Sequence, residues 1–168
     1  IFPLILSAIV LTLLALSVPF HTLRSDNDIQ WDFAGKKVSP SPYQVAQTAI
    51  STMKDNAGRM LAPDEISGIV TMFENHPKLV NARGLYIEFL SPAMDKHEYE
   101  DRALLHRFVS GVVEPGPAVR LALNSMKVNS IVIQQSNDSP ETKQLLEDER
   151  FRRIETINGY GIWFRITH

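Results

Sequence analysis

The chain has no cysteine among its 168 residues. It can therefore form neither disulfide bonds nor thiolate metal sites, and it offers no cysteine nucleophile. Strong charge of one sign is also missing, since the formal net charge is −2. The basic pairs Lys36-Lys37 and Arg152-Arg153 are too small to form the clustered positive surface that phosphate backbones require. We expect no nucleic-acid partner.

Signatures of catalysis and cofactor binding are missing as well. The sequence holds neither of the glycine-rich phosphate-binding motifs, no GxSxG elbow and no HExxH pair. His97, Asp101 and His106 lie in one acidic stretch, but His106 falls off the helix face that His97 and Asp101 share. Metal ligands must converge on one point. We therefore expect a solvated helix with a Glu98–Arg102 pair, and no metal, cofactor or catalytic residue.

A long hydrophobic run is present, and it opens the chain. Every residue from 1 to 20 is apolar, small and polar, or proline. As a helix, this segment is about 30 Å long, which matches the hydrocarbon core of a bilayer. A transmembrane helix is the favoured prediction. A cleavable signal peptide lacks its basic first part here, and a buried core helix is the remaining alternative.

The rest of the chain divides into a connector and a domain. Residues 21–42 are polar and rich in turn-forming residues, and residues 43–168 carry helix and strand patterns. Because the chain begins with Ile1 and not with methionine, we expect it to be the end of a longer protein. Residues 1–20 would then be the last membrane span of that protein.

Local patterns predict an α/β domain. A helix follows Pro42, and strands are expected at residues 59–62, 78–82 and 130–134. Asp64 suits the N-cap of a second helix, whereas residues 83–90 show a mixed pattern. Further helices are expected at residues 98–109, after Pro117, and after Ser139-Pro140. Asn158-Gly159 predicts a tight turn between strands 152–157 and 160–165.

Together these elements predict an N-terminal transmembrane helix followed by a small α/β sandwich. Its sheet is expected to be mostly parallel, with about four strands and a C-terminal hairpin, because a strand, a helix and a strand joined by short links usually form a parallel unit.

Polar residues follow three of the expected strands. Ligands of α/β proteins often bind beyond the carboxyl ends of strands. The candidate loops are therefore residues 63–65, 81–84 and 134–138, and the candidate ligand-binding residues are Asp64, Glu65, Asn81 and Arg83. Arg83 suits a phosphate or carboxylate. Simpler roles remain open, namely helix capping for Asp64 and a surface ion pair for Arg83.

Two stretches resemble a known group of membrane proteins. Residues 48–86 contain a helix, a strand that ends in LAP, a helix and a second strand. Residues 118–164 lead through MKVNSIVIQQ to FRRIETINGYGIWFR. These patterns are similar to the post-membrane region of polytopic bacterial glycosyltransferase-like proteins of the GT-C type. In such enzymes the acidic catalytic residues lie in an early loop, to which nothing in this chain corresponds.

The resemblance implies a non-catalytic, extracytoplasmic C-terminal domain of a cell-membrane protein. Its partners would be membrane lipid, the upstream transmembrane helices and a polyprenyl-phosphate sugar. The alternative is a single-pass, membrane-anchored binding or scaffold module of the cell envelope. A self-contained hydrolase is the third hypothesis.

Overall fold

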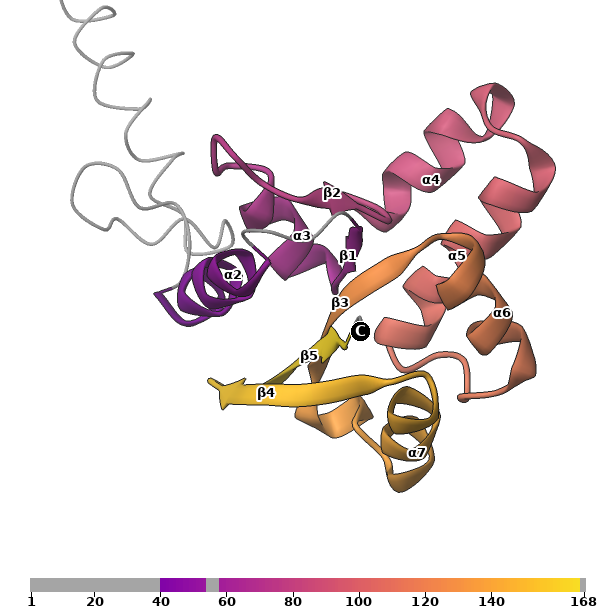
Figure 1. Ribbon diagram of the computed structural model, residues 1–168. Coiled ribbons are helices and arrows are strands. Elements are labelled where there is room, and N and C mark those ends of the chain that lie inside the picture. Colours follow the sequence, from indigo (N-terminus) through magenta and orange to yellow (C-terminus); the bar gives the residue numbers. More distant parts are fainter. Residues whose placement is uncertain (1–39, 54–57, 167–168) are drawn as a thin grey trace, which may run out of the picture. The chain divides into compact units, whose positions relative to one another are not determined.

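The computed structural model describes residues 40–53 and 58–166, which belong to one compact unit covering residues 38–168 (Figure 1). Short 3-10 turns at Ser91–Ala93 and Gln135–Asn137 interrupt its connections. The helices are α2 (Pro40–Thr52), α3 (Asp64–Val70), α4 (Gly84–Leu90), α5 (Lys96–Val109), α6 (Pro117–Ser125) and α7 (Pro140–Asp148). The strands are β1 (Arg59–Leu61), β2 (Lys78–Leu79), β3 (Val128–Gln134), β4 (Phe151–Ile157) and β5 (Tyr160–Arg165).

The α/β class is confirmed, but the prediction of a mostly parallel sheet is wrong. Five strands form a mixed sheet in the order β2-β1-β3-β5-β4. β1 is parallel to β2 and β3, whereas β5 is antiparallel to β3 and β4. The predicted hairpin turn is the reason. Asn158 and Gly159 both have positive φ, at 51° and 81°, so the chain reverses within two residues.

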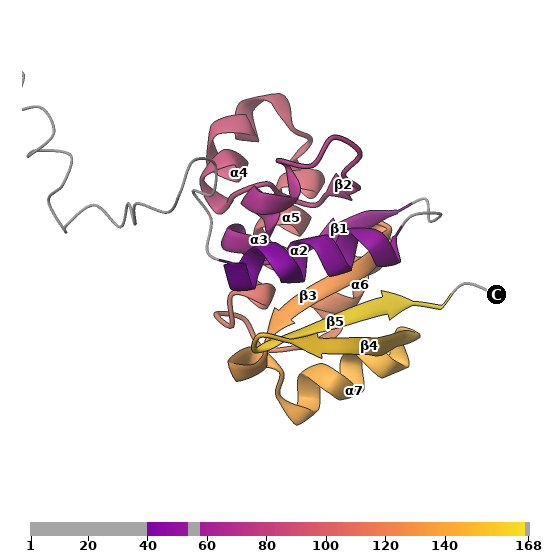
Figure 2. The same cartoon turned by 90° about the vertical axis from the view of Figure 1, so that its left-hand side faces the viewer.

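Helices cover both faces of the sheet (Figures 1 and 2). α2 and α3 pack on one face against Met60, Val132 and Ile162. α5, α6 and α7 pack on the other face against Leu61, Ile131, Ile133, Phe151 and Trp163. Successive residues of a strand point to opposite faces, so β1 and β3 supply both cores. The sheet is thus the middle of three layers.

Most of the predicted helix starts are confirmed. Ser139 caps α7 by accepting a hydrogen bond from the Thr142 amide, and Pro140 takes the first helical position. Pro117 likewise begins α6. One helix was missed, because α4 occupies residues 84–90, where the pattern is mixed. Five of its seven residues are apolar or aromatic and lie all round the helix, so the sequence shows no one-sided apolar stripe.

The predicted transmembrane helix, residues 1–20, lies outside the described residues, as does the connector up to residue 39. The helix expected after Pro42 begins at Pro40. Within residues 40–53 and 58–166, no helix combines the length and the apolar character needed to cross a bilayer.

Candidate functional site

Because β1, β2 and β3 are parallel, the predicted loops after them lie at the same end of the sheet. β2 lies on one side of β1 and β3 on the other. α3, which follows β1, packs on one face, whereas α5, which precedes β3, packs on the opposite face. At such a reversal, α/β proteins commonly bind ligands beyond the carboxyl ends of the strands. The loop after β1 lies at this position.

Asp64 joins two of the predicted loops, and its predicted role as a helix cap is wrong. Pro63 is the N-cap of α3, and the Pro63 carbonyl accepts hydrogen bonds from the amides of Ile66 and Ser67. The Asp64 carboxylate instead accepts a bond from the Gly84 amide, with N–O distances of 2.9 and 3.0 Å. Asp64 therefore ties the loop after β1 to the start of α4.

The same carboxylate contacts His106, a residue that sequence reasoning did not connect with it. His106 Nε2 lies 3.0 Å from Asp64 Oδ1. A Cβ atom at Gly84 would lie only 2.4 Å from His106 Cε1, so the imidazole occupies the space of a side chain at this position. Glycine at position 84 is thus the sequence signal of a close approach, although it does not identify the partner.

Glu65 is tied to a different neighbour. The Tyr160 hydroxyl donates a hydrogen bond to Glu65 Oε1. Burial raises the pKa of Tyr160 well above its ordinary value, and the bond to the Glu65 carboxylate raises it further. The phenol therefore stays protonated over the physiological pH range and remains a donor. Glu65 in this way connects α3 with the start of β5.

Asn81 and Arg83 lie in the loop after β2, but they face different surroundings. Asn81 is 5% exposed, and neither its amide nitrogen nor its amide oxygen has a hydrogen-bond partner among the described residues. Arg83 is exposed and lies over α3, where a Cβ at Gly68 would be 3.6 Å from its Nε. The predicted surface ion pair of Arg83 is not among those within residues 58–166.

The third predicted loop, residues 134–138, is engaged in structural contacts. Asp138 is buried and pairs with Arg153 of β4. Asn137 Nδ2 donates to the Val109 carbonyl at 3.3 Å, which holds the loop against the end of α5. The one charged residue of this loop, Asp138, is therefore already paired.

The arrangement supplies an Asp–His pair but no complete catalytic set. In the described residues, the imidazole of His106 makes its one side-chain hydrogen bond to Asp64, and no hydroxyl group is bonded to this ring. Residues 40–53 and 58–166 also hold no group of three acidic or histidine side chains placed to bind a metal ion. His97 instead lies beside Glu100, at 3.8 Å, and Glu98 pairs with Arg102 as predicted.

Comparisons with protein families, with curated proteins and with solved structures find no match to this chain. The candidate site thus contains two fixed contacts, Asp64 with Gly84 and His106, and Glu65 with Tyr160. Among the described residues it also contains a buried amide without a partner at Asn81 and an arginine without an ion pair at Arg83.

Proposed function

We propose that this chain is the non-catalytic, extracytoplasmic C-terminal part of a multi-spanning, glycosyltransferase-like membrane protein that uses a lipid-linked sugar donor. Its catalytic acids would lie upstream, in another loop of that protein. The domain would rest against the membrane through α4. The observation that carries the proposal is the apolar surface of this short helix.

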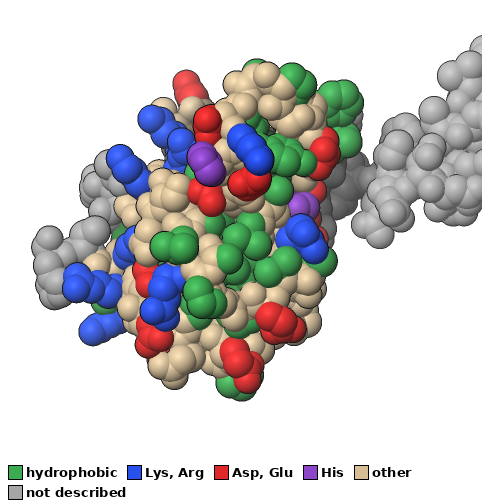
Figure 3. Space-filling model, turned by 90° about the vertical axis from the view of Figure 1, so that its right-hand side faces the viewer, with side chains coloured by type: hydrophobic (Ala, Val, Ile, Leu, Met, Phe, Trp, Pro, Cys, Tyr) green, Lys and Arg blue, Asp and Glu red, His purple; other side chains and the backbone are tan. Residues whose placement is uncertain are grey.

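Four of the seven residues of α4 are large, apolar and exposed, namely Leu85, Tyr86, Phe89 and Leu90. Phe89 is 71% exposed and Leu85 62%. Figure 3 shows the face that carries α4, and hydrophobic side chains lie open near its top, where Figure 1 places this helix. Exposed apolar patches of this kind mark interaction surfaces. Leucine and aromatic side chains suit the boundary between headgroups and acyl chains.

Charge next to the patch supports the same assignment. Arg83 immediately precedes α4, is exposed, and has no carboxylate partner among the described residues. Its planar guanidinium is suited to a phosphate oxygen. A lipid phosphate, or the phosphate of a polyprenyl-linked sugar, would meet Arg83 when α4 lies on the membrane. Asp64, through its bond to the Gly84 amide, would hold the start of α4 next to Arg83.

The absence of cysteine allows a direct test of membrane contact. We would introduce single cysteines as Leu85→Cys and, as the control, Leu121→Cys on α6, whose leucine is 71% exposed. Each variant of the full chain would carry an environment-sensitive fluorophore in lipid nanodiscs. The Leu85 label is expected to shift to shorter wavelength and to be quenched by brominated lipids. Equal behaviour of the two labels would overturn the membrane contact.

The enzymatic part of the proposal needs the intact parent protein. Membranes containing it should transfer sugar from polyprenyl-phosphate donors, whereas residues 1–168 alone should not. Arg83→Ala in the intact protein should reduce product formation, with Arg107→Ala, an exposed arginine of α5, as the control. Sugar transfer by the chain alone would sink the non-catalytic assignment.

The alternative of an anchored binding module is favoured by one specific feature, a charged groove beside β4. A gene that encodes a single membrane span and a domain that binds an envelope component would establish this alternative and exclude the glycosyltransferase-like parent.

A further inference from the structure

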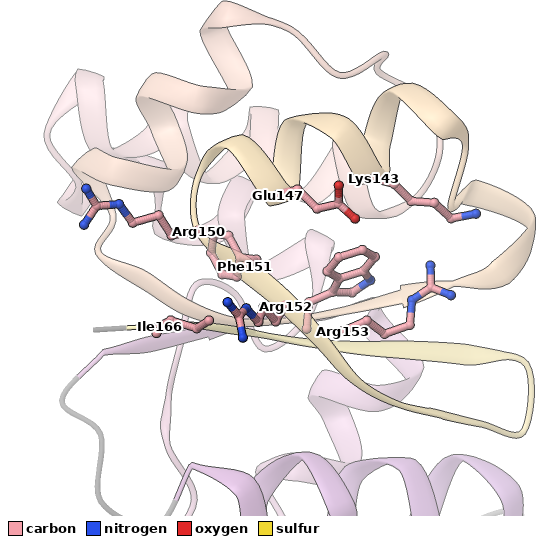
Figure 4. A pocket seen from close by; sticks show the side chains of 8 residues that line it. Lys143, Glu147, Arg150, Phe151, Arg152, Arg153 and Ile166 are labelled. Atoms are coloured by element: carbon pink, nitrogen blue, oxygen red, sulfur yellow. The ribbon is translucent and has the colours of Figure 1, made fainter. Parts of the chain in front are cut away.

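A groove lies between α7 and β4, at the β4 edge of the sheet (Figure 4). Its volume is about 890 Å³. Lys143 and Glu147 of α7 line one wall, and Arg150 to Arg153 line the other, with Trp163 and Ile166 completing the lining. Figure 4 shows Arg150 at one end and Lys143 at the other, so positive charge brackets the groove.

β4 is an edge strand, because in the described part of the sheet it pairs with β5 alone. The Ile166 amide donates to the Arg150 carbonyl at 2.9 Å. Opposed residues of an antiparallel pair alternate between bonded and non-bonded positions. With Phe151 opposite Arg165 and Arg153 opposite Trp163, the main-chain groups of Phe151 and Arg153 point away from β5. Phe151 is 1% exposed, so its main-chain groups are covered, whereas Arg153 is exposed. At Arg153 the edge therefore offers a main-chain donor and acceptor that have no partner in the described part of the sheet.

The charges of the groove favour an acidic occupant. Of its four cations, Arg153 is paired with Asp138 and lies over the Trp163 ring, 4.8 Å from the centroid. Lys143, Arg150 and Arg152 form none of the ion pairs recorded within the described residues. One acid, Glu147, faces these three cations. An acidic ligand would supply the missing counter-charges.

We propose that an extended, acidic peptide segment binds in this groove and adds a strand to the open edge of β4. Main-chain hydrogen bonds to Arg153 would hold the peptide, and the flanking cations would select acidic side chains. The proposal is independent of the membrane attachment proposed above.

The probe is the peptide acetyl-Glu-Val-Glu-Val-Glu-Val-Glu-amide, added to the full 168-residue chain in mild detergent. Hydrogen exchange by NMR would follow the amide of Arg153. We expect it to exchange at least severalfold more slowly with peptide, whereas Lys78 and Leu79 at the opposite edge of the sheet stay unchanged. A version with N-methylated valines keeps the charge but cannot pair, and it should give no protection.

A matched pair of variants tests the charge. Lys143→Glu in the groove should weaken peptide binding about tenfold, because one exposed ion pair becomes a repulsive contact. Lys78→Glu, the same change on β2, should leave binding unchanged. Circular dichroism would confirm that both variants fold. A peptide with glutamine in place of glutamate should bind the original chain about as weakly as the acidic peptide binds the Lys143→Glu variant.

Three results would overturn the proposal. The first is no slowing at Arg153, which would mean that the charged, bulged edge only prevents pairing. The second is equal binding of the N-methylated peptide, which would show attraction without strand addition. The third is protection that rises with protein concentration alone, which would identify a second copy of the chain as the occupant.

Discussion

The two halves of the sheet are stabilised in different ways. The parallel half contains β1 and β2, with three and two residues, whereas the antiparallel half contains β4 and β5, with seven and six. The long strands pair over most of their length and bury Phe151 and Trp163. The short strands rely on side chains from elsewhere. Arg102 of α5 donates to the Val80 carbonyl, and Asp64 holds the Gly84 amide. A short strand thus needs help from loops and helices.

Removing a large core side chain from the antiparallel half should have the largest effect. Phe151 is 1% exposed, and Phe151→Ala should lower the free energy of unfolding by about 3–5 kcal/mol. Leu79→Ala in β2, where the side chain is only half-buried, should cost about 1 kcal/mol. Urea denaturation of the full chain measures both. Equal losses would contradict the contrast between the two halves.

Gly84→Ala should break the contact that joins the loops of the parallel half. The new methyl group would collide with His106, so we expect a loss of about 1–3 kcal/mol in the free energy of unfolding. Gly116→Ala is the matched control, because a Cβ there meets nothing within 4 Å. In a His106→Ala background, Gly84→Ala should cost much less. An unchanged cost there would exclude His106 as the cause.

Asn81→Leu should stabilise the parallel half. The amide is buried without a partner among the described residues, and an apolar side chain of similar size removes this penalty. We expect the free energy of unfolding to rise by about 1–2 kcal/mol in thermal or urea denaturation. A fall would mean that the Asn81 amide has a partner that stabilises it.

Tyr160→Phe tests the bond that joins the two halves through Glu65. At neutral pH the free energy of unfolding should fall by about 1 kcal/mol, since a partly exposed hydrogen bond is lost. Tyr43→Phe, at a hydroxyl with no recorded hydrogen bond in the described part of the chain, is the control and should change little.

Tyr160 also makes the free energy of unfolding depend on pH. Because the pKa of Tyr160 is higher in the folded chain than the ordinary value of about 10, its contribution is complete below pH 10. Above that pH the unfolded chain loses the phenolic proton first, and stability falls as pH rises. Tyr160→Phe should make this alkaline fall shallower. An unchanged slope would show that Tyr160 does not contribute to it.

Features of the fold that depend only on residues adjacent in the sequence were predictable. The Asn158-Gly159 turn and the Ser139-Pro140 helix start follow from local stereochemistry, and the structure confirms both. The direction of β5 beside β3 was not predictable, because strand pairing depends on packing and not on pattern.

The candidate site shows the same division. Asp64 and Arg83 were placed correctly beyond the strand ends, whereas the contact of Asp64 with His106 spans 42 positions in the sequence and has no local signature. The helix cap predicted for Asp64 failed because Pro63 takes that position and frees the carboxylate for Gly84. The exposed apolar face of α4 was missed, since apolar residues all round a short helix give no periodic signal.

The strand order also sets when the protein can fold during synthesis. β1 is synthesised long before its neighbour β3. Arg59 of β1, for example, pairs with Val128 of β3. Pairing across such a long stretch of chain closes slowly. Met60 and Leu61, both fully buried at the end, therefore remain without most of their contacts while α4, α5 and α6 leave the ribosome. These apolar side chains are therefore open to aggregation until β3 emerges.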